Sequence, residues 1–193
     1  MEDTVGAPWI AIGGSCRENI TCAVSASPGG KEHPMSRRTA ARDPWVWGQA
    51  LLGALVIFGV PRAAHLLGLP APGHLWQVLG GVVLGAGALG MVIGALTLGP
   101  NLTPATEPLP DGQLVTRGIY HLVRHPIYLG VSLVLCGYSL LRAGGWAGAV
   151  VLIVSIAYFE QKARVEEAWL SKRVPGYEEY RSRVSRIIPG GWH

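Results

Sequence analysis

Five side chains that could do chemistry lie close together in the segment GIYHLVRHPIYLG, residues 118–130. They are Tyr120, His121, Arg124, His125 and Tyr128. Pro126 follows four of them and suits the first turn of a helix, because the N–H that proline lacks would be unpaired there. A largely apolar run comes next. The segment therefore predicts a polar cluster at the N-terminus of an apolar helix, where free N–H groups favour anions and polar groups.

Three interpretations of this cluster are open on the residues alone. Tyrosine, histidine and arginine are ordinary residues of a membrane interface, so the cluster could be an anchor. His121 and His125 are four residues apart, but a helix that starts at Pro126 begins after both and removes the shared face that a metal site needs. We therefore expect no metal. The third interpretation is a ligand pocket that the cluster forms with the loop before it and with a later, charged segment.

That later segment is YFEQKARVEEAWL, which has helical spacing and follows an apolar run directly. Lys162 and Glu166 are four residues apart, so they share one face of the helix. A short hairpin would hold this face near Arg124 and Tyr128. A carboxylate and a cation that meet aromatic and imidazole groups could hold a zwitterionic ligand that carries an adenine.

The elements that must position these residues are apolar. Of the 193 residues, 49% are hydrophobic and only 15% are charged, whereas about 25% is usual in soluble domains. About 20 apolar residues cross a membrane, and four apolar stretches are visible, at about 45–67, 75–99, 127–142 and 146–160. The last two stretches are joined only by Arg142-Ala-Gly-Gly, which predicts a tight hairpin. We expect an all-α polytopic membrane protein with about four transmembrane helices and a C-terminal helical segment in the cytoplasm.

The basic residues indicate the orientation in the membrane. Residues 1–44, 100–126 and 161–193 hold 5, 2 and 7 Lys and Arg, whereas the loops on the other side hold only Arg62 and Arg142. Cytoplasmic segments are enriched in Lys and Arg, so both termini are expected in the cytoplasm. Because the positive charge is sorted by loop, the net charge of +4 does not point to a nucleic acid as partner.

The chain divides into two regions. Residues 1–42 are rich in Gly, Ser, Pro and charge, which predicts a disordered arm. Met35 opens a short basic run and would suit a natural start, which would make residues 1–34 an upstream extension. Residues 43–193 form the membrane domain, with the cofactor region at about 100–193. Within it, residues 100–117 hold four prolines and can form no long helix, and a break is expected at Pro175-Gly176.

The segments LVTRGIYHLVRHPIYLG, KARVEEAWL and YEEYRSRVSRIIP together resemble the isoprenylcysteine carboxyl methyltransferase family and its bacterial relatives. The resemblance covers roughly residues 75–190. It implies an integral membrane enzyme, here of a bacterial inner membrane, that binds S-adenosyl-L-methionine at the cytoplasmic ends of its helices. It also implies a route from the bilayer for a lipid or apolar methyl acceptor.

Carried over by position, the resemblance implies a cofactor pocket lined by Gln113, Leu114, Val115, Tyr120, His125, Pro126, Ile127, Tyr128 and Glu166. Glu166 would pair with the ammonium of the methionine part. Lys162 stands where the family has a substrate-side arginine, and lysine lacks the planar fork that binds a carboxylate through two bonds. Arg124 could attract an anionic acceptor or brace its loop, and we assign no catalytic residue.

The acceptor and the reaction class leave alternatives. A small thiol, an isoprenoid carboxylate and a lipid-like amine would all suit a site without an obvious nucleophile, because the cofactor already carries an activated methyl group. The alternatives to a methyltransferase are a nicotinamide-dependent membrane reductase and a membrane protein without catalytic activity. The sequence does not specify the oligomeric state.

Overall fold

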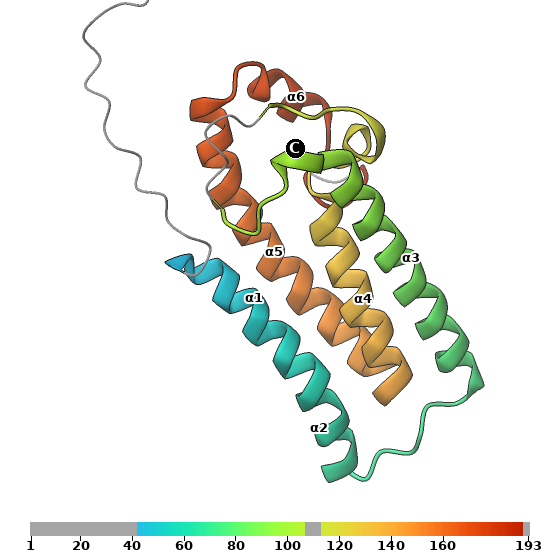
Figure 1. Ribbon diagram of the computed structural model, residues 1–193. Helices are drawn as coiled ribbons and strands as arrows, with labels where there is room; N and C mark the ends of the chain where they lie inside the picture. Colours follow the sequence, from blue (N-terminus) through green and yellow to red (C-terminus); the bar gives the residue numbers. More distant parts are fainter. Residues whose placement is uncertain (1–41, 107–112, 191–193) are drawn as a thin grey trace, which may run out of the picture. The chain divides into compact units, whose positions relative to one another are not determined.

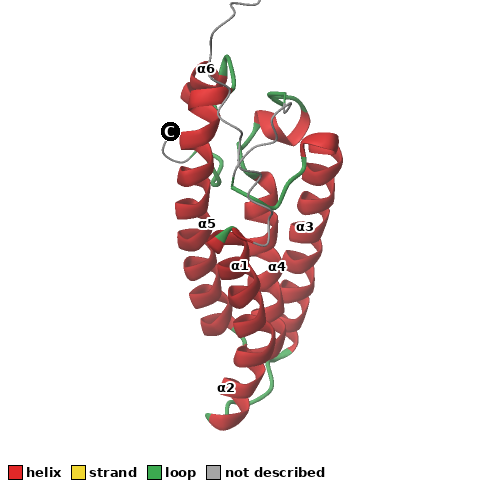
Figure 2. Ribbon diagram, turned by 60° about the vertical axis from the view of Figure 1, so that its left-hand side comes forward, coloured by secondary structure: helices red, strands yellow, loops and turns green. Residues whose placement is uncertain are grey.

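The structure, a computed structural model, describes residues 42–106 and 113–190. The predicted disordered arm lies outside these ranges except for Arg42. The main elements along the chain are α1 (Pro44–Ala54), a π-helical turn (Leu55–Gly59), α2 (Val60–Leu66), α3 (His74–Leu98), α4 (Pro126–Ala143), α5 (Gly145–Arg173) and α6 (Tyr177–Arg183) (Figure 1). Two short 3₁₀ turns, Gly99–Asn101 and Gly118–His121, accompany them. The described ranges contain helices and one isolated β-bridge, and Figure 2 shows no strand, so the all-α prediction is confirmed.

Three of these helical segments are long and apolar enough to cross a membrane: Pro44–Leu66, His74–Asn101 and Pro126–Ala143. They match the first three predicted spans within two residues. The fourth predicted span is the first half of α5, which continues without a break into the charged segment. Its apolar part is shorter, so a fourth crossing stays a prediction. The tight hairpin between α4 and α5 is confirmed, with Gly144 at φ 79° forming the turn.

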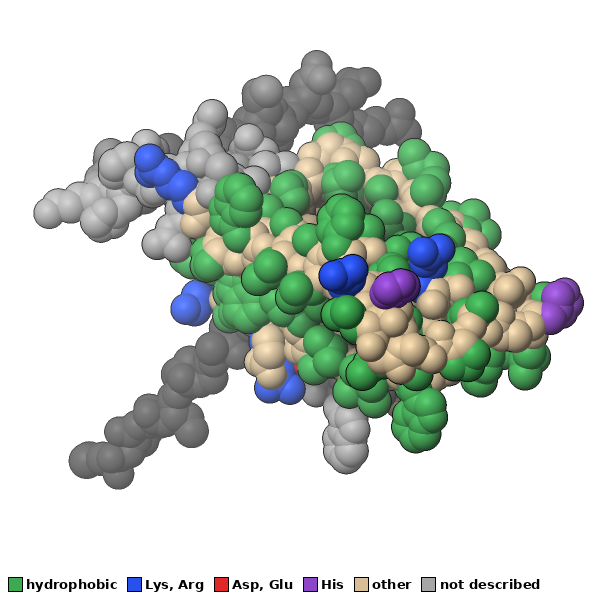
Figure 3. Space-filling view, turned by 90° about the horizontal axis from the view of Figure 1, so that it is seen from below, with side chains coloured by type: hydrophobic (Ala, Val, Ile, Leu, Met, Phe, Trp, Pro, Cys, Tyr) green, Lys and Arg blue, Asp and Glu red, His purple; other side chains and the backbone are tan. Residues whose placement is uncertain are grey.

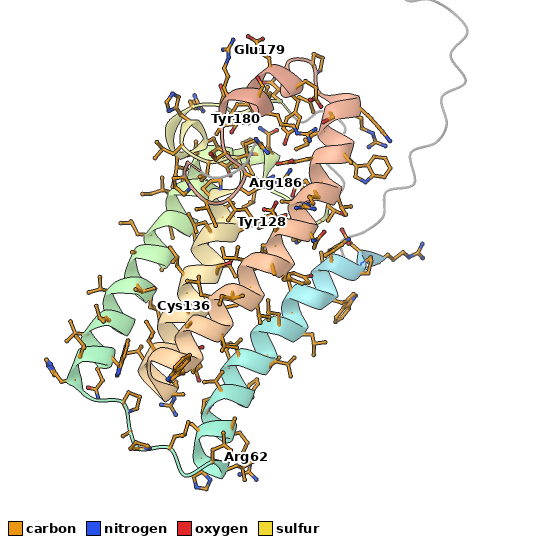
Figure 4. All side chains as sticks on the ribbon, turned by 180° about the vertical axis from the view of Figure 1, so that it is seen from behind. Arg62, Tyr128, Cys136, Glu179, Tyr180 and Arg186 are labelled. Carbon is orange, nitrogen blue, oxygen red and sulfur yellow. The ribbon has the colours of Figure 1, made fainter. Side chains whose placement is uncertain are left out.

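The two ends of the bundle differ in charge. Seen from the end where α2 and the α4–α5 turn lie, the surface consists of hydrophobic side chains and tan areas of backbone and other side chains, with a few basic and histidine side chains (Figure 3). Figure 4 shows Arg62 at this end, whereas Tyr128, Tyr180 and Arg186 lie towards the opposite end. The chemistry-bearing residues therefore gather at one end of an apolar bundle, as the sequence predicts.

The helices α3 and α4 pack through a seam of glycines spaced seven residues apart. These are Gly80, Gly87 and Gly94 on α3 and Gly130 and Gly137 on α4. A Cβ added at Gly137 would lie 2.5 Å from the backbone nitrogen of Leu84, and one added at Gly87 would lie 2.7 Å from the Gly130 carbonyl oxygen. The two backbones are thus in direct contact, which is how small residues hold helices together in lipid.

The first membrane helix contains a π-helical turn, and one carbonyl in this turn accepts a hydrogen bond from a side chain of another helix. Pro61 has no N–H, so it cannot donate to the carbonyl of Ile57 four residues earlier. Instead, the hydroxyl of Tyr138 on α4 donates to the Ile57 carbonyl at 2.8 Å. This bond ties α4 to the π-helical turn, and because lipid offers no hydrogen bonds it also removes an unpaired polar group.

A compact polar cap, residues 118–125 together with 160–187, covers one end of the bundle. Gly176, at φ 80°, forms the predicted break between α5 and α6. The chain then returns to the start of α4, where the N–H groups of Arg124 and His125 donate to the carbonyls of Ser185 and Arg186, each at 2.9 Å. This short pairing fixes the polar cluster against the C-terminal segment and so positions the site.

Candidate functional site

A cavity of about 340 Å³ lies between the polar cap and the helices. Its walls come from α1, the end of α3, the segments 101–104 and 113–115, α4, α5 and α6. Nine of the residues predicted to form the site line it: Gln113, Leu114, Val115, Tyr120, His125, Ile127, Tyr128, Lys162 and Glu166. The structure thus brings together the RHP turn and the charged part of α5, which are about 40 residues apart in the chain.

Glu166, Tyr128 and His125 meet at one wall of this cavity. The hydroxyl of Tyr128 donates to Glu166 Oε2 at 2.6 Å, and His125 Nδ1 lies 3.8 Å from the same oxygen. The rings of His125 and Tyr128 stack in parallel with centroids 5.1 Å apart, and Tyr128 stacks in turn on Phe159 at 5.0 Å. The side chain of Glu166 keeps 23% of its surface exposed, so its carboxylate is open to a ligand.

Glu167, the next residue along, faces away from Glu166 and forms the centre of a buried ion network. Its Oε1 accepts from Arg124 Nε at 2.8 Å and lies 3.2 Å from His125 Nε2, while its Oε2 accepts from Arg186 Nε at 2.9 Å. Burial alone would raise the pKa of Glu167, but the hydrogen bonds from His125 and Arg124 outweigh it and hold the pKa at about 2. Glu167 is therefore a permanent negative charge behind the cavity wall.

Arg124 braces the polar cap. Besides its bond to Glu167, its Nη1 donates to the carbonyl of Arg181 at 2.8 Å and to that of Val184. Only 1% of its side chain is exposed. Of the two roles open for Arg124, the geometry therefore supports the structural one, since its guanidinium binds the end of α6 and the segment that follows.

Lys162 joins three walls of the cavity. Its Nζ donates to Gln49 Oε1 on α1 at 2.7 Å and to the Pro104 carbonyl at 3.1 Å, and it lies 5.2 Å from the centre of the Tyr128 ring. The residue is 1% exposed. Burial lowers the pKa of Lys162, and the negative charges of Glu166 and Asp43 oppose only part of this shift.

Asp43 fixes the start of α1 against the loop that follows α3. Its Oδ1 accepts from the N–H of Trp45 at 2.9 Å and so caps α1, while its Oδ2 accepts from both the N–H and the hydroxyl of Thr106 at 2.7 Å. Burial would raise the pKa of Asp43, but the bonds from Thr106 and Trp45 lower it overall. Asp43 thus holds together two elements that form the side of the cavity.

Pro126 is the predicted cofactor residue that does not line the cavity. It begins α4 and packs against the bare backbone of Gly94 on α3, where an added Cβ would lie 3.5 Å from the proline ring. Its contribution is therefore indirect, because it sets the direction of the turn that carries Ile127 and Tyr128. Within the described residues, no group of three or more His, Cys, Asp and Glu could hold a metal ion.

Several lining residues were not predicted from the sequence, among them Gln49, Phe159, Leu170, Tyr177 and Tyr180. Phe159 and Leu170 share a helical face with Lys162 and Glu166, so the spacing along α5 could have found them. Gln49 is a polar residue inside an apolar span, which often marks a functional position. Tyr180 lies in the segment YEEYRSRVSRIIP that carries part of the resemblance, but the bond from its hydroxyl to the Tyr120 carbonyl at 2.6 Å is a contact that only the fold creates.

In the comparison with protein families, the chain matches the phospholipid methyltransferase family over residues 76–174, which is just over half of the chain. Curated relatives include protein-S-isoprenylcysteine O-methyltransferases from three organisms. The protein from Schizosaccharomyces pombe is 38% identical over 86 residues, which cover 44% of this chain and 36% of that protein. The protein from Dictyostelium discoideum is 31% identical over 121 residues, covering 54% and 48%, and that from Saccharomyces cerevisiae is 33% identical over 85 residues, covering 44% and 36%.

The chain thus spans between about a third and a half of the length of these relatives. The family match contains α4, α5 and nearly all of α3, and hence the RHP turn, Lys162, Glu166 and Glu167. It ends before α6. The chain therefore belongs to the phospholipid methyltransferase family, in agreement with its resemblance to the isoprenylcysteine carboxyl methyltransferases.

Proposed function

We propose that the chain is an integral membrane methyltransferase that uses S-adenosyl-L-methionine and acts on a small or lipid-like acceptor. The observation that carries this proposal is the convergence of Glu166, His125 and Tyr128 on one cavity at the end of apolar helices. The family match covers these same residues, and the relatives are named as methyltransferases. We propose as cofactor contacts the lining residues named from the sequence, with Pro126 acting through its turn.

The acceptor atoms of this wall suit an ammonium group. An ionised carboxylate can only accept hydrogen bonds, and 23% of the Glu166 side chain stays exposed at the cavity wall. A negatively charged acceptor in this position favours a ligand that brings a positive charge and several N–H donors, such as the amino group of a methionine.

The remainder of the cavity suits an aromatic base and an apolar acceptor. Tyr128 and Phe159 present stacked rings, and Val131 and Leu170 add apolar surface from α4 and α5. Cavities of roughly 300–1,000 Å³ with apolar walls and a few polar groups are typical of small-molecule sites. The volume of about 340 Å³ lies at the lower end of this range, which favours a tight fit around the cofactor.

Methyl transfer requires little of the protein besides the positioning of the acceptor and the methyl donor. When bound, the sulfonium of the methyl donor supplies an activated methyl group. The residues of the chain have to hold the acceptor in line with that group and exclude water; well-oriented intramolecular reactions gain about 7–11 kcal/mol in this way. An ionised carboxylate or thiolate needs no general base. A neutral thiol or amine would have to release a proton.

Lys162 is the residue we propose for the acceptor side. Its Nζ now donates to Gln49 and Pro104, so contact with an acceptor would exchange one of these bonds. As a point charge it would attract a carboxylate less specifically than an arginine fork would. This favours a broader acceptor range, including a small thiol or a lipid-like group besides an isoprenoid carboxylate.

The orientation belongs to the same proposal. Basic residues are concentrated in the segments on the side of the polar cap, and cytoplasmic segments carry more Lys and Arg. We therefore propose that the cavity and both termini face the cytoplasm, in a bacterial inner membrane. The comparisons give no support to the alternative of a nicotinamide-dependent reductase, and a protein without catalytic activity is an outcome that the experiment below separates.

The test is calorimetric binding of S-adenosylhomocysteine to the purified full chain in detergent. The wild type is expected to bind, and Glu166→Gln is expected to weaken binding about 10-fold or more, because it removes a charged hydrogen-bond acceptor. Glu179→Gln is the matched control, since Glu179 is 68% exposed on α6 and does not line the cavity. Absence of binding by the wild type, with or without stabilisation by NADPH, would overturn the proposed function. Equal affinity in wild type and Glu166→Gln would overturn the role of Glu166 alone.

The acceptor can be identified separately. Labelled S-adenosyl-L-methionine and the purified chain are added to membrane extracts, and the labelled product is identified by mass spectrometry. We expect the product to be lost with Glu166→Gln and kept with Glu179→Gln.

A further inference from the structure

A second hollow, of about 460 Å³, lies outside the cavity described above, along α5 beside the start of α1. We call it the α5 groove. Its lining includes two tryptophans, two basic residues and small apolar side chains, namely Trp45, Trp169, Arg164, Lys172, Val165 and Ala168. No Asp or Glu is among the described residues that line it, so the groove itself is positively charged.

The groove lies at the level of a membrane surface. The first membrane helix begins at Pro44, which places Trp45 in its first turn. On α5 the apolar run ends at Phe159 and charged residues begin at Glu160. Tryptophan and basic residues gather at this level in membrane proteins, because their amphipathic side chains suit the headgroup region.

An apolar stripe leads into the groove along α5. Trp146, Val150 and Ile153 are 87%, 56% and 69% exposed, and they recur at intervals of three and four residues, which places them on one helical face. The same spacing continues along the helix to Arg164, Ala168 and Lys172. A chain that lies on the stripe would therefore end in the groove.

Arg164 is free to take up a further partner. Its side chain is 58% exposed, and its Nε lies 3.5 Å from Glu160 Oε1. That same oxygen also accepts from Arg186 Nη1, so its negative charge is shared between two arginines. Exposed ion pairs of this kind contribute little, which leaves most of the donors of Arg164 available.

We propose that the α5 groove binds the headgroup of an anionic phospholipid. Arg164 and Lys172 hold the negative charge, Trp45 and Trp169 flank the glycerol region, and an acyl chain lies on the stripe that ends at Ile153. A zwitterionic lipid has the same shape near the phosphate but no net charge, so the two basic residues should discriminate between the two classes. This site does not depend on the methyltransferase proposal, because it shares no lining residue with the cavity.

Native mass spectrometry of the full chain tests this proposal. The chain is purified in neutral detergent and mixed with equal amounts of phosphatidylglycerol and phosphatidylcholine of the same acyl length, and the ratio of the two bound lipids is measured. We expect the wild type to prefer phosphatidylglycerol. Because each basic residue near an anionic surface contributes about 1 kcal/mol, or roughly fivefold, Arg164→Gln with Lys172→Gln should lower the ratio about 25-fold or bring it close to one.

The matched control is Arg117→Gln with Arg183→Gln, which removes the same charge from exposed positions at the same end of the bundle. It should keep the wild-type ratio. The proposal is overturned if the wild type shows no preference, if the groove variant keeps the wild-type ratio, or if the control loses as much as the groove variant. Thermal unfolding of all three proteins without added lipid checks that they are folded.

Discussion

The bundle and the polar cap are held together by opposite means. In the bundle, α3 and α4 approach until backbone meets backbone at Gly87 and Gly137. In the polar cap, one buried carboxylate, that of Glu167, accepts from Arg124, His125 and Arg186. Close packing in the bundle requires residues without a side chain, whereas the polar cap depends on a carboxylate whose two oxygens both have charged or imidazole partners. A substitution should therefore act in one region according to its size and in the other according to its charge.

The largest effect is expected from Glu167→Gln. The change keeps the size but removes the negative charge that the buried Arg124 shares with Arg186, which is partly buried and keeps Glu160 as a partner. Removing one partner of a buried ion pair costs about 3–5 kcal/mol. Thermal unfolding in detergent should show this loss, and limited proteolysis should cut the C-terminal segment before the bundle. Equal stability of Glu167→Gln and wild type would show that the network is not what holds the polar cap.

Low pH should also destabilise the wild type, because protonation of Glu167 removes the same negative charge. The pKa of Glu167 is about 2 in the folded chain against an ordinary 4.5. A lowered pKa means that its stabilisation is complete above the ordinary value and is lost as the pH falls from 4.5 towards 2. Unfolding temperatures measured from pH 6 to pH 3 should fall more for the wild type than for Glu167→Gln. If the unfolding temperatures of the two proteins fall equally with pH, the lowered pKa of Glu167 does not contribute to stability.

Gly137→Ala tests the bundle by size alone. The added methyl group would lie 2.5 Å from the Leu84 nitrogen, so the helices must separate, and overpacking of this kind costs about 1–3 kcal/mol. Gly81→Ala on the open side of α3, where nothing lies within 4 Å, is the control. It should be neutral or slightly stabilising, because alanine favours a helix more than glycine does. Circular dichroism during heating measures both.

Tyr138→Phe should have the smallest effect. It removes the hydroxyl that donates to the Ile57 carbonyl and keeps the ring, so a loss of about 0.5–1.5 kcal/mol is expected. Stability in detergent measures it. A larger loss than for Gly137→Ala would show that hydrogen bonding, rather than close packing, dominates the bundle.

Much of the site could be predicted because its residues have recognisable partners in the chain. The order RHP followed by an apolar run marks the start of α4, and the spacing of Lys162 and Glu166 marks one face of α5. Glu167 was visible beside Glu166, but its role was not. Neighbouring residues on a helix point about 100° apart, and only the return of the chain after α6 supplies Arg186 as a partner.

The sequence by itself determined the elements and their environment: apolar stretches long enough for a membrane, a proline that begins α4, a Pro-Gly break before α6 and a polar end. These follow from local properties, namely hydrophobicity, backbone restriction and helical spacing. The tertiary structure alone decided which polar group meets which. Asp43 and Thr106 are 63 residues apart and Lys162 and Gln49 are 113 apart, and a hydrogen bond between such residues has no local signature. It exists only because close packing of the helices brings their ends to the same place.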